Sequence, residues 1–174
     1  MEQINEALLR TEEREFVITR TFDAPRDLVW KAWTERERLE QWWGPKGFKI
    51  EVHSFDLRPG GVFHYSMNAA NGYVMWGKFV YREIAAPERL VFVSAFSDAE
   101  GNITTNPFKL KLALETLNVV TLEEVDGKTL LTLKGGPINA TEEELATYFG
   151  MRSSMEQGFA GTFEQLDEVL VTMV

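Results

Sequence analysis

The stretch TEEELATYFGMRSSMEQGFAGTFEQLDEVL, residues 141–170, decides the fold because it predicts one long helix. Thr141, followed three residues later by Glu144, fits a capping box, which begins a helix by satisfying free backbone N–H groups. Apolar residues then recur at helical spacing: Leu145, Tyr148, Phe149, Met155, Phe159, Phe163, Leu166 and Leu170. A helix of about 29 residues would be about 43 Å long, enough to cross a whole β-sheet.

Before this helix, from residue 48 to about 135, apolar and polar residues alternate with a period of two, which predicts β-strands. An earlier strand is expected within residues 15–24. The other expected strands are two within 48–67 around a turn at Pro59 and Gly60, then 73–84, 90–97, 108–125 and 128–135. Strands joined by short turns pair antiparallel, so we expect one antiparallel sheet.

Two short helices are expected between the first strand and the rest of the sheet. The first begins near Pro25, and Thr34 with Glu37 fits a second capping box that begins the next helix. The sequence GPKG ends that helix, which places Trp42 and Trp43 on its last turn. Adjacent residues lie about 100° apart on a helix, so we expect one tryptophan to seal the core and the other to cover a cavity mouth. The alternative is a binding platform made by both.

Together these elements predict an α+β fold with a single domain over residues 15–174, preceded by a loose N-terminal lead over residues 1–14. The sheet must bury one face, and the long helix is the element large enough to cover it. A strongly curved sheet cannot touch a straight helix along its whole length. We therefore expect a cavity between the two, which is a typical place for a small ligand.

The composition excludes several classes of function. The net charge of −9 disfavours a nucleic-acid partner and anionic membrane surfaces. No apolar run approaches the roughly 20 residues that span a bilayer, so no membrane insertion is expected. The chain has no cysteine, hence no disulfide, thiolate nucleophile or cysteine–zinc site. The acidic N-terminus lacks a signal-peptide apolar region, so we expect a cytoplasmic protein. No cofactor is indicated.

Four motifs carry a resemblance to a known family. The chain resembles the START-like (SRPBCC) superfamily, in the branch related to the activator of Hsp90 ATPase (AHSA1-like proteins). The motifs are FDAPRDLVWKAWTERERLEQWWGPKGF at 22–48, FDLRPGG at 55–61, GKFVYREIAAPERLVF at 77–92 and GFAGTFEQLDEVL at 158–170.

The resemblance implies a helix-grip fold, in which a curved antiparallel sheet wraps around the long C-terminal helix and encloses a hydrophobic tunnel, with two short helices after the first strand. Members bind lipids, sterols, polyketides or plant hormones, or act as cyclases. Family members often have Trp where this chain has Phe159, and a proline-interrupted segment where this chain has the smooth sequence FKLKLAL at 108–114.

The candidate ligand-binding residues share one face of each strand or the facing side of the long helix, and several are Met, which adapts to varied ligand shapes. A plain core would use the same residue types, and a one-residue slip in strand phase would invert the set. The candidates are Trp42, Trp43, Phe63, Tyr65, Met67, Met75, Phe79, Tyr81, Phe92, Ser94, Phe96, Met151, Arg152, Met155 and Phe159.

Some candidates have two interpretations. Arg152 either reaches a ligand carboxylate or pairs with a surface acid. The helix glycines, Gly150, Gly158 and Gly161, each cost about 1 kcal/mol relative to Ala, and either allow close packing on the sheet or keep space for a ligand. With a two-residue turn at Pro59 and Gly60, we expect the exposed side chains of His53 and His64 to lie about 7 Å apart on one face.

Neither metal binding nor catalysis has a clear sequence signal. His53 and His64 lack an evident third ligand, so we expect no metal site. Glu83, Glu123 and Glu124 have no spacing that identifies an acid–base pair, and whether the protein is an enzyme stays open.

Three functions remain open. The first is a binding protein for a small hydrophobic or amphipathic molecule, which predicts an apolar cavity of several hundred Å³ with a few polar groups. The second is a cyclase or hydrolase-like enzyme, which predicts a carboxylate or histidine with a perturbed pKa in that cavity. The third is an Hsp90-related interaction module, which predicts an exposed apolar patch and a filled tunnel. It is weakened because the full co-chaperone also uses a separate N-terminal domain, which we do not expect here. A homodimer is compatible with the sequence, but no feature indicates one.

Overall fold

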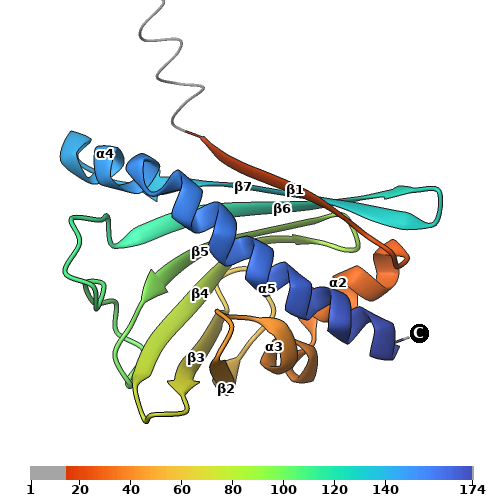
Figure 1. Ribbon diagram of the computed structural model, residues 1–174, viewed down its shortest axis with the longest axis horizontal. Coiled ribbons are helices and arrows are strands. Elements are labelled where there is room, and N and C mark those ends of the chain that lie inside the picture. The colour runs from red at the N-terminus through yellow and green to blue at the C-terminus, as the bar shows by residue number, and fades with distance from the viewer. Residues whose placement is uncertain (1–14, 174) are drawn as a thin grey trace, which may run out of the picture.

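The computed structural model describes residues 15–173 and shows one long helix crossing the concave face of a curved antiparallel sheet (Figure 1). The N-terminal lead expected over residues 1–14 lies outside the described residues. The seven strands are β1 (Phe16–Phe22), β2 (Phe48–Phe55), β3 (Val62–Ala69), β4 (Val74–Ala85), β5 (Arg89–Phe96), β6 (Glu115–Val125) and β7 (Lys128–Ile138). Their order across the sheet is β1-β7-β6-β5-β4-β3-β2, with antiparallel neighbours throughout.

Four helices complete the described residues: α2 (Arg26–Thr34), α3 (Arg36–Trp42), α4 (Glu142–Gly150) and α5 (Arg152–Met173). The two short helices after the first strand and the helix-grip architecture are confirmed. No helix within residues 15–173 is long and apolar enough to cross a membrane.

The core lies at one end of the grip, where α2, α3 and the C-terminal half of α5 meet the sheet (Figure 1). The rings of Trp33 and Trp42 meet edge to face with centroids 4.7 Å apart, and Phe163 from α5 packs against both. Every buried residue of α5 lies at or after Thr162. The N-terminal half of this helix is therefore not sealed against the sheet.

The expected single helix is interrupted, which corrects the sequence prediction. Helix α4 ends at Gly150, and Met151 has φ −92° and ψ 8°, outside the helical region. Glycine has low helix propensity, and a Cβ built at Gly150 would meet no atom within 4 Å, so close packing does not account for the glycine at this break. The capping box of Thr141 and Glu144 that begins α4 is confirmed.

The strand expected over residues 108–125 begins only at Glu115, which is a second correction. The ladder between β6 and β7 starts with Glu115 opposite Ile138, so the preceding residues have no strand to pair with. Asn106 bends the segment instead, because its Oδ1 accepts from the backbone N–H groups of Phe108 and Leu110 at 3.0 and 3.1 Å. Residues 97–114 form a long loop between β5 and β6 (Figure 1).

The second capping box, at Thr34, is also wrong. Thr34 is the last residue of α2, and its hydroxyl donates back to the Trp30 carbonyl at 2.7 Å. Glu35 takes the N-cap position of α3 without a side-chain cap. Thr34 belongs to α2 and Glu35 separates it from the first residue of α3, so the threonine is not in the position that caps α3.

The connection between β2 and β3 is longer than the predicted two-residue turn, because β2 ends at Phe55 and β3 begins at Val62. The register shifts between Val52 and Ser54, so His53 occupies a β-bulge. The ring centroids of His53 and His64 are 5.8 Å apart. His64 is buried rather than exposed as expected, because its Nε2 lies 3.1 Å from the Asp98 carbonyl of the covering loop.

Candidate ligand-binding cavity

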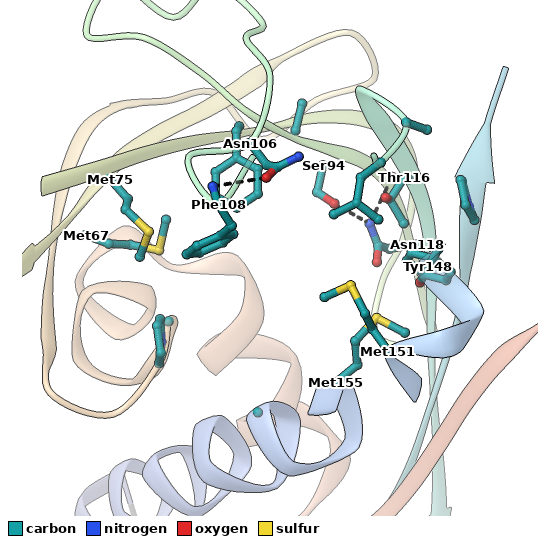
Figure 2. Close-up of a pocket in the computed structure, with 18 of the residues that line it drawn as sticks. Met67, Met75, Ser94, Asn106, Phe108, Thr116, Asn118, Tyr148, Met151 and Met155 are labelled. Carbon is teal, nitrogen blue, oxygen red and sulfur yellow. Dashed lines mark hydrogen bonds between the residues drawn. The ribbon is translucent and has the colours of Figure 1, made fainter. Parts of the chain in front are cut away.

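A cavity of about 420 Å³ lies between the sheet and the N-terminal half of α5 (Figure 2). Its walls come from the end of α3, the central strands, the 97–114 loop and the junction of α4 with α5. This volume is within the range of about 300–1,000 Å³ typical of small-molecule sites. The position follows from the packing, because the bulky aromatic core fills the opposite end of the grip.

Four methionines give the cavity much of its apolar wall. Met67 and Met75 are directly opposite each other on β3 and β4, and Met151 and Met155 face them from the helix junction (Figure 2). Phe159 follows one turn later on α5 and also lines the space. Methionine is unbranched and polarisable, so such a wall adapts to more than one ligand shape.

A polar cluster lies at another part of the wall. Asn118 on β6 is only 8% exposed, and its Nδ2 donates to the Ser94 hydroxyl at 2.9 Å and to the Thr116 carbonyl at 3.1 Å. Tyr148 on α4 lies beside this amide (Figure 2). Burial raises the pKa of Tyr148 to about 12, an effect that nearby Arg152 partly opposes. The cluster therefore offers neutral hydrogen-bonding groups at neutral pH.

Trp43 and Tyr65 form the wall near the end of α3. A Cβ at Gly77 would lie 2.7 Å from the Tyr65 hydroxyl oxygen, so only glycine allows the tyrosine ring to lie this close to β4. Burial raises the pKa of Tyr65 to about 12, while a hydrogen bond with the Trp43 side chain lowers it. The Tyr65 hydroxyl is thus engaged by the protein itself.

Gly158 lines the cavity from α5 and is exposed. A Cβ built there would meet no atom within 4 Å. Close packing of the helix on the sheet therefore does not explain this glycine. The geometry favours the other interpretation, in which the glycine keeps space for a ligand. Gly161 differs, because a Cβ there would contact the Lys46 side chain at 3.6 Å.

Ten of the predicted site residues line the cavity, and the strand phase agrees with the prediction. They are Trp43, Tyr65, Met67, Met75, Phe92, Ser94, Phe96, Met151, Met155 and Phe159.

Five others lie outside the lining. Trp42, Phe63, Phe79 and Tyr81 are almost wholly buried in the core, so the same strand faces supply both core and cavity. The guanidinium of Arg152 lies over the Phe149 ring at 5.7 Å, and its Nη2 donates to the Glu15 carbonyl at 3.4 Å.

Sequence reasoning identified Ser94 but missed Thr116, Asn118 and Tyr148 of the polar cluster and the lining that the 97–114 loop contributes. Val120 and Leu122 point inward from β6, and the same alternation continues to Asn118 and Thr116. Polar residues on an otherwise apolar inward face were the available signal. Residues 108–114 of the loop gave no such signal, because their alternation of apolar residues with lysine predicted a strand. The lining that this loop contributes is Thr104, Asn106, Phe108, Leu112, Ala113 and Leu114.

The acids considered for catalysis lie outside the cavity lining. Glu83 and Glu124 are exposed, with Glu83 accepting from Arg89 at 2.8 Å and Glu124 from the Arg26 backbone N–H at 3.2 Å. Glu123 is exposed as well. Within residues 15–173 no group of three His, Cys, Asp or Glu side chains is arranged to hold a metal ion.

Solved structures share this architecture over nearly the whole chain. Protein Ms6760 from Mycobacterium smegmatis is 28% identical, with a TM-score of 0.75 and 91% of each chain covered. A protein from Arthrobacter aurescens is 29% identical, with a TM-score of 0.75, 92% of this chain and 88% of that chain covered. The AHSA1 protein from Silicibacter pomeroyi is 17% identical, with a TM-score of 0.69, 92% and 99% covered, and shares the fold. No curated protein matches the chain.

The family model described as "Activator of Hsp90 ATPase homolog 1-like protein" matches residues 23–171. This match spans both short helices, six of the seven strands and nearly all of α5. It agrees with the resemblance carried by the four sequence motifs and with the helix-grip architecture. The chain therefore belongs to the activator of Hsp90 ATPase homolog 1-like family, within the START-like superfamily.

Proposed function

We propose that this protein binds a small hydrophobic or amphipathic molecule in the cavity between the sheet and α5. The main support for this proposal is the cavity of about 420 Å³, which remains open although the neighbouring core is densely packed with aromatic side chains. Gly158 supports it, because an alanine there would fit without a clash and would favour the helix by about 1 kcal/mol. A protein that only needed a filled interior would gain stability from that change.

The lining favours binding over catalysis. A cyclase or hydrolase needs an acid or base in contact with its substrate. The cavity-lining side chains in the described part of the chain include no Asp, Glu or His. An Hsp90-related module has one supporting observation, the exposed Phe108, Leu110 and Leu114 on the 97–114 loop. We rank it second, because such a module does not require the cavity.

The proposal is tested by native and denaturing mass spectrometry of freshly purified protein. We expect excess mass under native conditions that disappears on denaturation. The matched variant Gly158→Leu, which adds a bulky side chain at the cavity lining, should show the bare mass. If wild-type protein also shows the bare mass and binds neither 1-methylnaphthalene nor 1-naphthol in solution, the binding function is contradicted.

A further inference from the structure

The polar cluster contains one unsatisfied atom, and its position limits what the cavity recognises. The Asn118 amide uses its Nδ2 for Ser94 and Thr116, and no described residue donates to its Oδ1. The Thr116 carbonyl can only accept, so it fixes which end of the amide is nitrogen. Asn118 lines the cavity, so its Oδ1 is available to accept a hydrogen bond from a donor on a ligand.

The Tyr148 hydroxyl lies close to the same atom. A Cβ built on Gly135, which is opposite Asn118 on β7, would lie 3.5 Å from Asn118 Oδ1 and 3.6 Å from the Tyr148 hydroxyl oxygen. Both oxygens therefore face the same small space (Figure 2). One is an acceptor only, and the other is a hydroxyl that can donate.

A ligand hydroxyl satisfies both groups at once, because it donates one hydrogen bond and accepts another. A carbonyl or ether oxygen would leave the Asn118 acceptor unpaired. A carboxylate oxygen at this position would face Asn118 Oδ1. Both atoms can only accept hydrogen bonds, so no bond would form between them. No Lys, Arg or His of the described residues lines the cavity to pair with the carboxylate directly, and the nearby Arg152 guanidinium lies over the Phe149 ring instead.

We propose, resting on the binding function above, that Asn118 and Tyr148 recognise a hydroxyl group and that the ligand is an uncharged amphipathic alcohol or phenol. The hydroxyl donates to Asn118 Oδ1 and accepts from the Tyr148 hydroxyl. The rest of the molecule lies against the methionine wall.

Three probes of one ring system test this inference: 1-naphthol, 1-methylnaphthalene and 1-naphthoate. Their binding to the full chain is measured by isothermal titration calorimetry at pH 7. We expect 1-naphthol to bind about tenfold more tightly than 1-methylnaphthalene, since two hydrogen bonds distinguish them, and 1-naphthoate to bind most weakly.

The variant Tyr148→Phe removes one hydroxyl and should reduce the preference for 1-naphthol by about three- to tenfold, with 1-methylnaphthalene unaffected. Tyr65→Phe is the matched control, because it makes the same change in the same cavity but outside the polar cluster of Asn118 and Tyr148. It should leave the preference unchanged.

The outcomes separate the two proposals. Equal binding of 1-naphthol and 1-methylnaphthalene, or tightest binding of 1-naphthoate, overturns hydroxyl recognition while the binding function stands. A preference that survives Tyr148→Phe unchanged overturns the assignment of Tyr148. Failure of all three probes to bind contradicts the binding function itself.

Discussion

At the level of single residues, the two adjacent tryptophans at the end of α3 have different roles. Trp42 is buried, and its Nε1 donates to the Ala32 carbonyl at 2.8 Å, near the C-terminal end of α2. Carbonyls in the last turn of a helix lack partners within the helix, so this indole stabilises the end of α2. Trp43 lines the cavity and packs edge to face on Phe79 at 5.1 Å.

Trp42→Phe should therefore lower the free energy of unfolding by about 2 kcal/mol or more, through lost volume and an unpaired buried carbonyl. Trp43→Phe should cost less than half as much, because its side chain borders the cavity. Urea unfolding followed by circular dichroism measures both. Equal losses for the two variants would contradict the different roles.

Gly158 gives a second prediction at this scale. Gly158→Ala should raise the free energy of unfolding by about 0.5–1 kcal/mol, because alanine favours a helix and meets open space here. It should preserve probe binding, whereas Gly158→Leu should abolish it with the fold retained. A destabilised Gly158→Ala variant would show that the site has no spare room.

Among the elements, α4 depends on its cap because it contributes no fully buried residue. The Thr141 hydroxyl accepts from the Glu144 N–H at 3.2 Å, and the Glu144 carboxylate accepts from the Thr141 N–H at 2.8 Å. Thr141→Ala should cost about 1 kcal/mol and increase hydrogen exchange in α4. Exchange in α4 that does not change would contradict this dependence.

Thr34→Ala is the matched control for this prediction. The same residue type fits the same sequence motif there, but its hydroxyl bonds back within α2. We expect a change of less than about 0.5 kcal/mol, typical of a site without a special structural role. A loss as large as that of Thr141→Ala would mean that Thr34 does contribute a cap.

The elements show what sequence patterns can and cannot predict. The strand faces were predictable, because alternation fixes which side chains of β3, β4 and β5 point inward. The loop over residues 108–114 was not, since its alternation fits a strand and only the lack of a pairing partner prevents one. The break between α4 and α5 at Met151 could not be predicted either, because one stripe of apolar residues continues through both helices.

For the whole molecule, the motifs predicted the family and the helix-grip fold, but not which inward-facing residues would line the cavity and which would join the core. The separation of these two groups depends on where α2 and α3 pack. Their tryptophans fill one end of the grip, so Phe63, Phe79 and Tyr81 join the core while Met67 and Met75 border the cavity. Only the three-dimensional positions of the short helices separate these two groups.

The same packing depends on polar contacts between α5 and the segment after α3. Thr162 and Gln165 both donate to the Gly44 carbonyl, at 3.0 and 2.9 Å, and Lys46 pairs with Glu164. The hydrogen bond and charge of Lys46 lower the pKa of Glu164 below its ordinary value of 4.5. These contacts join the short helices to the long one.

A lowered pKa in the folded state means that the unfolded chain takes up this proton first as the pH falls. The contribution of Glu164 to stability is thus present above about pH 4.5 and is lost as the pH falls through the folded value. Glu164→Gln should be less stable than wild type at pH 7, and the difference should shrink as the pH falls below 4.5 and the carboxylate takes up its proton. Urea midpoints over a series of pH values measure this.

Asp98 is the control for the charge effect of Lys46 on Glu164. The pKa of Asp98 is lowered chiefly by hydrogen bonds from Asn102 and neighbouring backbone N–H groups rather than by a lysine. Salt at 1 M shortens the screening length to about 3 Å, so it should shrink the effect of Glu164→Gln at pH 7. The effect of Asp98→Asn should change little. If salt leaves the Glu164 difference intact, its origin is the hydrogen bond to Lys46 rather than the opposite charge.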